Sequence, residues 1–315
     1  MSNEARLLGR WDLYRVMTTE TAQIDLTTAL GIRREHLLRS QNPDGGWGYF
    51  PGKASWLEPT AHAALVLHRE DAGRRALELL GRWQRPDGAW QPNAQVKNAY
   101  WGTALMLTLY RATGRQDAGY SRGLEWLVRT TGAEGSLPVR IVERFQAKVV
   151  EQDDSVRGWP WRPGNSSWVE PTAHALVALK QSPRAVEFVA RIQEGESYLL
   201  DRRCPDGGWN YGNKRVYHTD MVSFPETTAL ALVGLQGRSH SELKPSLHRA
   251  LAHAKSTKSG MARAWLAMAL RLHGVPWETR LAGLSPGRDI SIAALEYLAF
   301  EPDAYKVFQV EKRHT

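Results

Sequence analysis

The chain has 315 residues, 42% of them hydrophobic, which is enough to bury a sizeable core in one repeat-built domain or in two ordinary domains. The formal net charge of +8 comes from basic residues spread among 33 acids, with no compact basic block and no zinc-finger or helix-turn-helix spacing, so a nucleic-acid partner is not expected. The single cysteine, Cys204, excludes an intramolecular disulfide, and the first thirty residues hold no long apolar run; both features predict a cytoplasmic protein with at most peripheral membrane contact.

A short turn motif recurs along the chain. Pro-Asp-Gly-x-Trp, where x is any residue, occurs in the copies that end at Trp47, Trp90 and Trp209. A degenerate copy spans residues 131–137, and a fifth ends at Trp159. Proline fixes φ, aspartate bonds to its own backbone and glycine accepts positive φ, so each copy predicts a turn.

Between the turns the apolar pattern is helical and of two alternating kinds. Short Ala/Leu-rich helices, apolar nearly all round, are predicted at residues 60–68, 102–110, 172–180 and 228–236. More amphipathic helices are predicted at 71–83, 183–192 and 245–254, with later helices at 259–274 and 289–300. Inner and outer helices that alternate in this way predict stacked helical hairpins, and inner helices buried on most sides predict a closed ring.

The expected fold is therefore all-α: an α/α toroid of inner and outer helices around a central cavity. We expect one domain over residues 1–315, with the repeats between about 20 and 300. The segment Val139–Gln152 fits this frame poorly, because only one helix separates two copies of the turn there.

One stretch of the chain, residues 47–63, returns without insertion or deletion at residues 159–175. In it Glu58 and His62 are four positions apart, as are Glu170 and His174, so each pair shares a helix face. One interpretation is helix-start chemistry, in which a serine three residues before each glutamate forms a capping box and each histidine is a core residue held by its glutamate.

The turn motif also carries a family resemblance. Gln-x-x-x-Gly-x-Trp, at residues 41–47 and again at 84–90, resembles the repeat of the squalene-hopene and oxidosqualene cyclases, and the protein prenyltransferase β subunits carry a related repeat. The resemblance implies an α/α toroid in which the glutamines tie helix ends together. Those cyclases protonate their substrates with Asp-x-Asp-Asp-Thr-Ala at the start of an inner helix. That string is absent here, and its third acidic position is taken by Glu58, Glu170 and Glu226.

On this frame the resemblance implies an isoprenoid or terpenoid cyclase-like enzyme that protonates a hydrophobic polyprenyl substrate. A carboxyl sunk among tryptophans has a raised pKa and can donate a proton at neutral pH. We expect Glu170 or Glu58 to be the acid, with His174 or His62 orienting it and no cofactor. Ring faces would stabilise a carbocation, and the expected aromatic residues are Trp56, Tyr100, Trp101 and Trp168.

Two alternatives stay open. Glu58, His62, Glu170 and His174 could supply ligands to a divalent metal, or the toroid could be a non-catalytic lipid-binding or scaffold protein. For a prenyl diphosphate ligand, phosphate contacts are expected at Arg140, Arg144 and Lys148, or at Lys214 and Arg215. Cys204 with His218 resembles part of the prenyltransferase zinc site, but Arg202 stands where that site has aspartate, so the match is interpreted as coincidence. The oligomeric state is not indicated.

Overall fold

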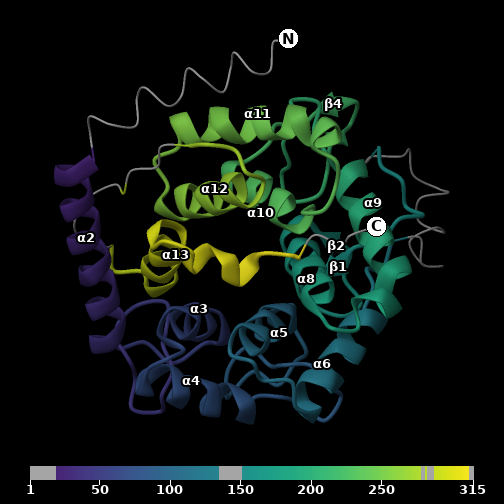
Figure 1. The fold of residues 1–315 in the computed structure, drawn as a ribbon. Coiled ribbons are helices and arrows are strands. Elements are labelled where there is room, and N and C mark those ends of the chain that lie inside the picture. Colours follow the sequence, from purple (N-terminus) through teal and green to yellow (C-terminus); the bar gives the residue numbers. More distant parts are fainter. Residues whose placement is uncertain (1–18, 135–150, 278–280, 282–286, 312–315) are drawn as a thin grey trace.

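The computed structural model describes residues 19–134, 151–277, 281 and 287–311, with side chains from residue 26 onward. Its helices form two concentric layers (Figure 1). Each inner helix packs on the next, and the last packs on the first, so the inner ring is closed. In ring order the inner helices are α3 (Leu57–Leu67), α5 (Gly102–Ala112), α8 (Val169–Gln181), α10 (Pro225–Gly234), α12 (Gly260–Leu272) and α13 (Ile290–Phe300).

The outer layer packs against this ring and completes the predicted α/α toroid, which is thereby confirmed. Short-helix and strand elements lie in the connections between the two layers. The outer helices are α2 (Thr19–Arg39), α4 (Asp71–Arg82), α6 (Ala118–Arg129), α9 (Val189–Asp201) and α11 (His240–Ser256). The remaining elements are the antiparallel pairs β1 (Trp159–Pro160) with β2 (Ser167–Trp168) and β3 (Arg215–Val216) with β4 (Thr219–Asp220), and the 3-10 helices η2 (Ala185–Phe188) and η3 (Ala304–Phe308).

The tryptophan of each turn clamps an outer helix to the inner helix that follows it. Its buried indole N–H donates to a carbonyl near the end of the preceding outer helix, and its backbone N–H donates to a threonine hydroxyl in the first turn of the next inner helix. The indole bonds are Trp47 to Leu37 (2.7 Å), Trp90 to Leu80 (2.9 Å), Trp159 to Leu127 (2.8 Å) and Trp209 to Leu199 (2.6 Å). The threonines are Thr60, Thr103, Thr172 and Thr228.

The two glutamines of the strict motif tie helix ends together, as the resemblance implied. The Gln41 amide donates to the carbonyls of Gly45 and Ala72, each at 2.8 Å, and so links its own turn to the start of α4. Gln84 repeats the arrangement one unit later, with Gly88 and the Gly119 carbonyl in α6. A glycine is required at Gly88, because its φ is +96° and a Cβ there would lie 2.3 Å from the Arg122 carbonyl oxygen.

The degenerate fourth copy and the fifth copy are two halves of one turn, which corrects the predicted repeat count. The indole of Trp159 reaches back 32 positions to Leu127, whereas the other three indoles reach back 10. Glu134 supplies the turn's acid and accepts from the Ser167 hydroxyl at 2.9 Å. The poorly fitting segment Val139–Gln152 therefore belongs to an insertion within a single turn, and most of it lies outside the described residues.

The capping-box interpretation is wrong. No side chain caps α3, α8 or α10, whose N-caps are Trp56, Trp168 and Phe224. The serines instead fasten each loop to the acid of its turn: Ser55 donates to Asp44 at 2.8 Å, and Ser223 donates to Asp206 at 2.9 Å, as Ser167 does to Glu134. This serine pattern is part of the repeat and leaves the neighbouring glutamates unoccupied by helix capping.

The two ends of the ring differ. At one end, which we call the mouth, loops 47–56, 90–101, 159–168 and 209–224 lead into inner helices. At the other end, the base, η3 runs across the ring (Figure 1). The Gln181 amide donates to the Val307 carbonyl at 2.8 Å, the Gln236 amide donates to the Phe308 carbonyl at 2.9 Å, and the Phe308 ring is fully buried. Within the described residues, no helix combines the length and apolarity needed to cross a bilayer.

Candidate active site

Two carboxyl groups from different inner helices lie near enough at the mouth to interact electrostatically. Glu58 and Glu170 stand in the first turns of α3 and α8, two helices that are separated in the ring by α5, and both are half-buried. Burial, together with the smaller effect of the negative charge of Glu58, raises the pKa of Glu170 to about 8. At neutral pH Glu170 is therefore a protonated acid.

Glu58 is held differently from Glu170. Its Oε2 accepts hydrogen bonds from the phenols of Tyr49 (2.5 Å) and Tyr100 (3.4 Å). The pKa of Glu58 is raised as well: burial has the largest effect, the two phenol bonds offset it in part, and nearby Asp289 adds to it. No hydrogen bond to the Glu170 carboxyl is found among the described residues. Glu58 is thus a hydrogen-bond acceptor held in place by two tyrosines, whereas Glu170 is a partly accessible acid without such bonds.

The two histidines face the interior of the ring, but His62 does not orient Glu58. Both ring nitrogens of His62 are buried without a hydrogen-bond partner, so the tyrosines, not this histidine, position that carboxyl. The His174 ring lies 5.0 Å from the Trp101 ring and 5.5 Å from the Trp265 ring. Burial lowers the pKa of His62 to about 4 and that of His174 to about 3, which leaves both neutral.

These buried histidines predict a loss of stability in acid. Because their pKa values of about 4 and about 3 lie below the ordinary 6.5, the unfolded chain binds protons first as the pH falls. The contribution of each histidine is full above pH 6.5 and should fall by about 2 kcal/mol at pH 5. Urea unfolding at pH 7 and pH 5 measures it as the difference in pH dependence between the wild-type protein and a variant with glutamine at both positions. Equal pH dependences of the two proteins would contradict it.

The aromatic residues predicted around the cavity lie at different depths. Tyr100 and Trp56 are half-buried near Glu58, Trp168 is 38% exposed at the mouth, and Trp101 is buried against His174. The ring centre is not the expected hollow: the side chains that meet there are at most 4% exposed, namely those of His62, Trp101, His174, Trp265 and Phe308. The two carboxyl groups therefore lie on the mouth side of these packed side chains.

The sequence analysis did not predict a second set of mouth residues, which stand two positions after each turn tryptophan. They are Tyr49, Pro92, Trp161 and Tyr211, and the carbonyl of each accepts a backbone N–H near the start of the preceding inner helix, at 2.8–3.2 Å. Three of the four are aromatic, and the Trp161 ring lies 5.4 Å from that of Trp101. The recurring Trp-x-aromatic spacing, visible in the sequence, was the signal that could have found them.

The remaining predicted residues do not join the pair. Glu226 begins α10 as expected, but the electrostatic interaction found for it is with His253 of the outer helix α11. Among the described residues no three His, Cys, Asp or Glu side chains come together to hold a metal ion, and this includes Cys204 and His218. Lys214 pairs with Asp201, and Arg215 pairs with Glu151 and Asp220. Arg140, Arg144 and Lys148 lie outside the described residues.

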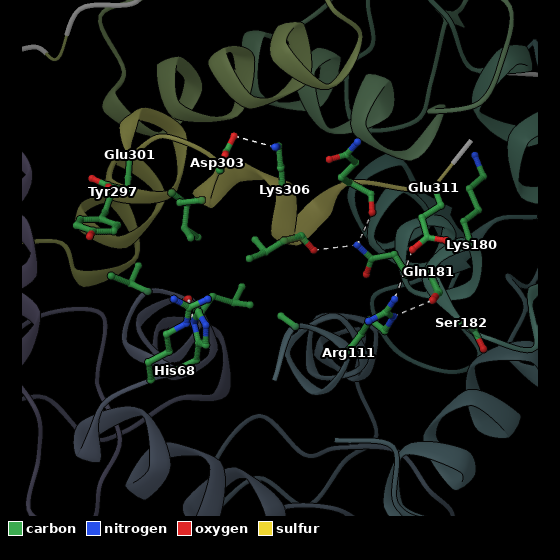
Figure 2. A pocket seen from close by; sticks show the side chains of 18 of the residues that line it. His68, Arg111, Lys180, Gln181, Ser182, Tyr297, Glu301, Asp303, Lys306 and Glu311 are labelled. Atoms are coloured by element: carbon green, nitrogen blue, oxygen red, sulfur yellow. Dashed lines mark hydrogen bonds and ion pairs between the residues drawn. The ribbon is translucent and has the colours of Figure 1, made fainter. Parts of the chain in front are cut away.

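A pocket of about 1220 Å³ lies at the base, away from the carboxyl pair. The ends of α3, α5, α8 and α13 and the segment around η3 line it, with charged groups on its walls (Figure 2). Arg111 donates to the Gln181 carbonyl at 3.3 Å, and Lys306 pairs with Asp303 at 2.9 Å. None of the predicted site residues lines this pocket.

Similar proteins were found by sequence. No family model matches the chain. A drimenyl diphosphate synthase of Streptomyces showdoensis is 30% identical over 191 residues, which cover 58% of this chain and 32% of the relative. Another drimenyl diphosphate synthase, from Streptantibioticus cattleyicolor, is 47% identical over 60 residues, or 18% of this chain and 11% of the relative. The match thus spans about a third of the length of the first of these proteins.

Solved structures share the ring. The type II terpene cyclase MstE from Scytonema superposes with a TM-score of 0.56 at 18% identity, covering 89% of this chain and 98% of that one. The family 8 endoglucanase Cel10 from Klebsiella pneumoniae reaches the same TM-score at 14% identity, covering 85% and 97%. Fold alone therefore leaves the chemistry open, whereas the sequence matches and the tryptophan repeat both point to the cyclases. The chain is a terpenoid-cyclase-like α/α toroid.

Proposed function

We propose that the mouth binds a hydrophobic polyprenyl substrate and that Glu170 protonates one of its carbon–carbon double bonds to start cyclisation or isomerisation. Drimenyl diphosphate synthases are the named sequence relatives, and the MstE cyclase has been solved in complex with geranylgeranyl dihydroxybenzoate as substrate. A substrate of this class, an isoprenoid chain with a polar head, suits the aromatic mouth.

The observation that carries the proposal is the asymmetry of the two carboxyl groups. Glu170 has no hydrogen-bond partner among the described residues, and burial raises its pKa to about 8, so its proton is available at neutral pH. Glu58, tied by Tyr49 and Tyr100, supplies the neighbouring negative charge that favours this protonated state. Two carboxyls with different surroundings thereby take different roles.

The reaction balances without an oxidant or a reductant. The Glu170 O–H bond breaks as a C–H bond forms on the substrate, which leaves a carbocation on the adjacent carbon. A second double bond can attack that cation, and loss of a proton from a neighbouring carbon ends the sequence. Tyr100, Trp161 and Trp56, half-buried around the carboxyls, offer ring faces that stabilise the cation.

The test is direct. Purified protein is incubated with farnesyl and geranylgeranyl diphosphate, and the products are dephosphorylated and identified by gas chromatography with mass spectrometry. The proposal expects products isomeric with the substrate, formed without added metal, with one double bond fewer for each ring closed in a cyclisation and a shifted double bond in an isomerisation.

A non-catalytic ring that binds lipid is the second candidate, because the aromatic side chains filling the ring centre leave a shallow mouth rather than a deep chamber. Tight binding of the prenyl chain without any turnover would favour this candidate and refute the proposed reaction.

A further inference from the structure

Large exposed apolar side chains gather at the mouth. Of the exposed large hydrophobic residues described, only Ile32 and Val186 lie elsewhere. The others all stand on the loops that lead into α3, α8 and α10, and we call them the mouth patch: Phe50 (45% exposed), Trp168 (38%), Tyr211 (54%), Tyr217 (72%), Met221 (37%), Val222 (63%) and Phe224 (38%). Exposed apolar side chains that gather in this way mark an interaction surface.

Three residues of the patch form a continuous surface beside the acid. The ring of Tyr211 lies 6.0 Å from that of Trp168 and 5.3 Å from that of Phe224. The residue next to Trp168, Val169, donates its backbone N–H to the Tyr211 carbonyl, and Glu170 follows directly. The apolar surface therefore reaches the edge of the carboxyl pair.

The β3–β4 hairpin projects part of this surface outward. Trp209 and its threonine are 19 positions apart, against 13 in the other repeats, and the extra length forms the hairpin. Its turn holds Tyr217 and His218 at positive φ, +47° and +60°, an unfavourable conformation for non-glycine residues. A two-residue hairpin turn takes positive φ at both central positions, and this turn leaves the Tyr217 ring in solvent, 72% exposed.

Unpaired positive charge surrounds the patch. Lys53, Lys97 and Arg162 are exposed on the mouth loops, and no ion pair is found for their side chains within the described ranges. On the hairpin, by contrast, Asp220 and the adjacent Glu151 are both paired with Arg215. The mouth therefore combines an apolar surface with free cations at its edge.

We propose that the mouth patch docks on the surface of a bilayer that contains anionic phospholipids. Apolar side chains would enter the headgroup region while Lys53, Lys97 and Arg162 contact lipid phosphates. A second copy of the chain fits the surface less well, because a two-fold contact would bring the same free cations of both copies together. Docking rests on this surface alone; delivery of a membrane-dissolved substrate to Glu170 rests also on the proposed function.

Sedimentation with vesicles tests the docking without any substrate. We expect the protein to bind phosphatidylcholine vesicles that contain 30% phosphatidylglycerol (about a third anionic lipid, enough for a strong surface potential), and to bind pure phosphatidylcholine weakly. Replacing Lys53 and Arg162 with glutamine should weaken binding about fivefold for each charge removed. The pair Tyr217→Ser and Val222→Ser should weaken it at least about tenfold through lost apolar burial.

The matched control is Val186→Ser, which removes an equally exposed apolar side chain, 72%, outside the mouth patch. It should leave vesicle binding unchanged.

Bromine-labelled lipids should quench tryptophan fluorescence, and Trp168→Phe should remove much of that quenching. Equal binding by the mouth variants and the control would overturn the proposal. If the protein forms a dimer in solution and the mouth substitutions disrupt it, the patch is a dimer interface and the proposal is wrong. Neither result bears on turnover of a detergent-dispersed substrate, so failure of docking and failure of the proposed reaction are distinguishable.

Discussion

Replacing Glu170 with glutamine is expected to lower turnover of the polyprenyl substrate by about a hundredfold or more, the usual contribution of a positioned general acid. Glutamine has nearly the same shape but cannot donate a proton to an alkene. Substrate affinity should stay within about twofold, because the amide keeps the volume of the carboxyl. In the wild-type protein, turnover should decline above about pH 8, where Glu170 loses its proton.

Two controls separate this effect from damage to the fold. Folding holds Glu170 protonated up to about pH 8, whereas the unfolded chain ionises it near 4.5, so the wild-type protein loses stability as the pH rises through that window. The glutamine variant should therefore melt at the same or a higher temperature at pH 8.5. Glu58→Gln removes the neighbouring charge, and the alkaline limb of its pH profile should move to lower pH. Undiminished product from Glu170→Gln, or an unmoved alkaline limb in Glu58→Gln, would refute the assignment.

Replacing Trp90 with alanine is expected to reduce the free energy of unfolding by about 3–5 kcal/mol, the range measured when large buried aromatic side chains are removed. The indole is fully buried, its N–H donates to the Leu80 carbonyl at 2.9 Å, and its ring lies 5.4 Å from that of Tyr110. Its removal leaves a cavity and an unpaired carbonyl between α4 and α5. Equilibrium urea unfolding measures the loss.

The comparison variant is Trp126→Ala, at a half-buried tryptophan of outer helix α6 that packs on the edge of the core. It should cost less than half as much. A similar loss from both substitutions would mean that the turn tryptophans stabilise the fold only through their bulk and not through the clamp between helices.

The sequence could predict the ring because its repeat is local. The turn around Trp47 and the glutamine tie of Gln41 are made largely by residues close in the chain, and each inner helix is apolar nearly all round. The helix boundaries were less accurate: α11 begins at His240, five residues before the predicted start, because Ser239 caps it and Pro245 is accommodated inside the helix. The interrupted turn ending at Trp159 has the sequence signature of two turns, because an insertion separates its halves.

The site could be predicted only in part, because it depends on contacts between distant segments. The duplicated glutamates marked the correct helix starts, but periodicity does not tell which of them meet. That Glu58 is tied by Tyr49 and Tyr100, and that Glu226 belongs with His253, follows from the order of helices around the ring. The burial of Phe308 in the ring centre depends on a C-terminal segment whose sequence carries no repeat signal.

Proton transfer from Glu170 to carbon is tested most directly by turnover in deuterium oxide. The carboxyl exchanges with solvent, so each product molecule should carry one deuterium at the carbon that was protonated, visible as a mass increase of about one unit and located by NMR. The Glu170→Gln variant should give no labelled product. Product that forms in deuterium oxide without any deuterium on carbon would contradict protonation as the first step.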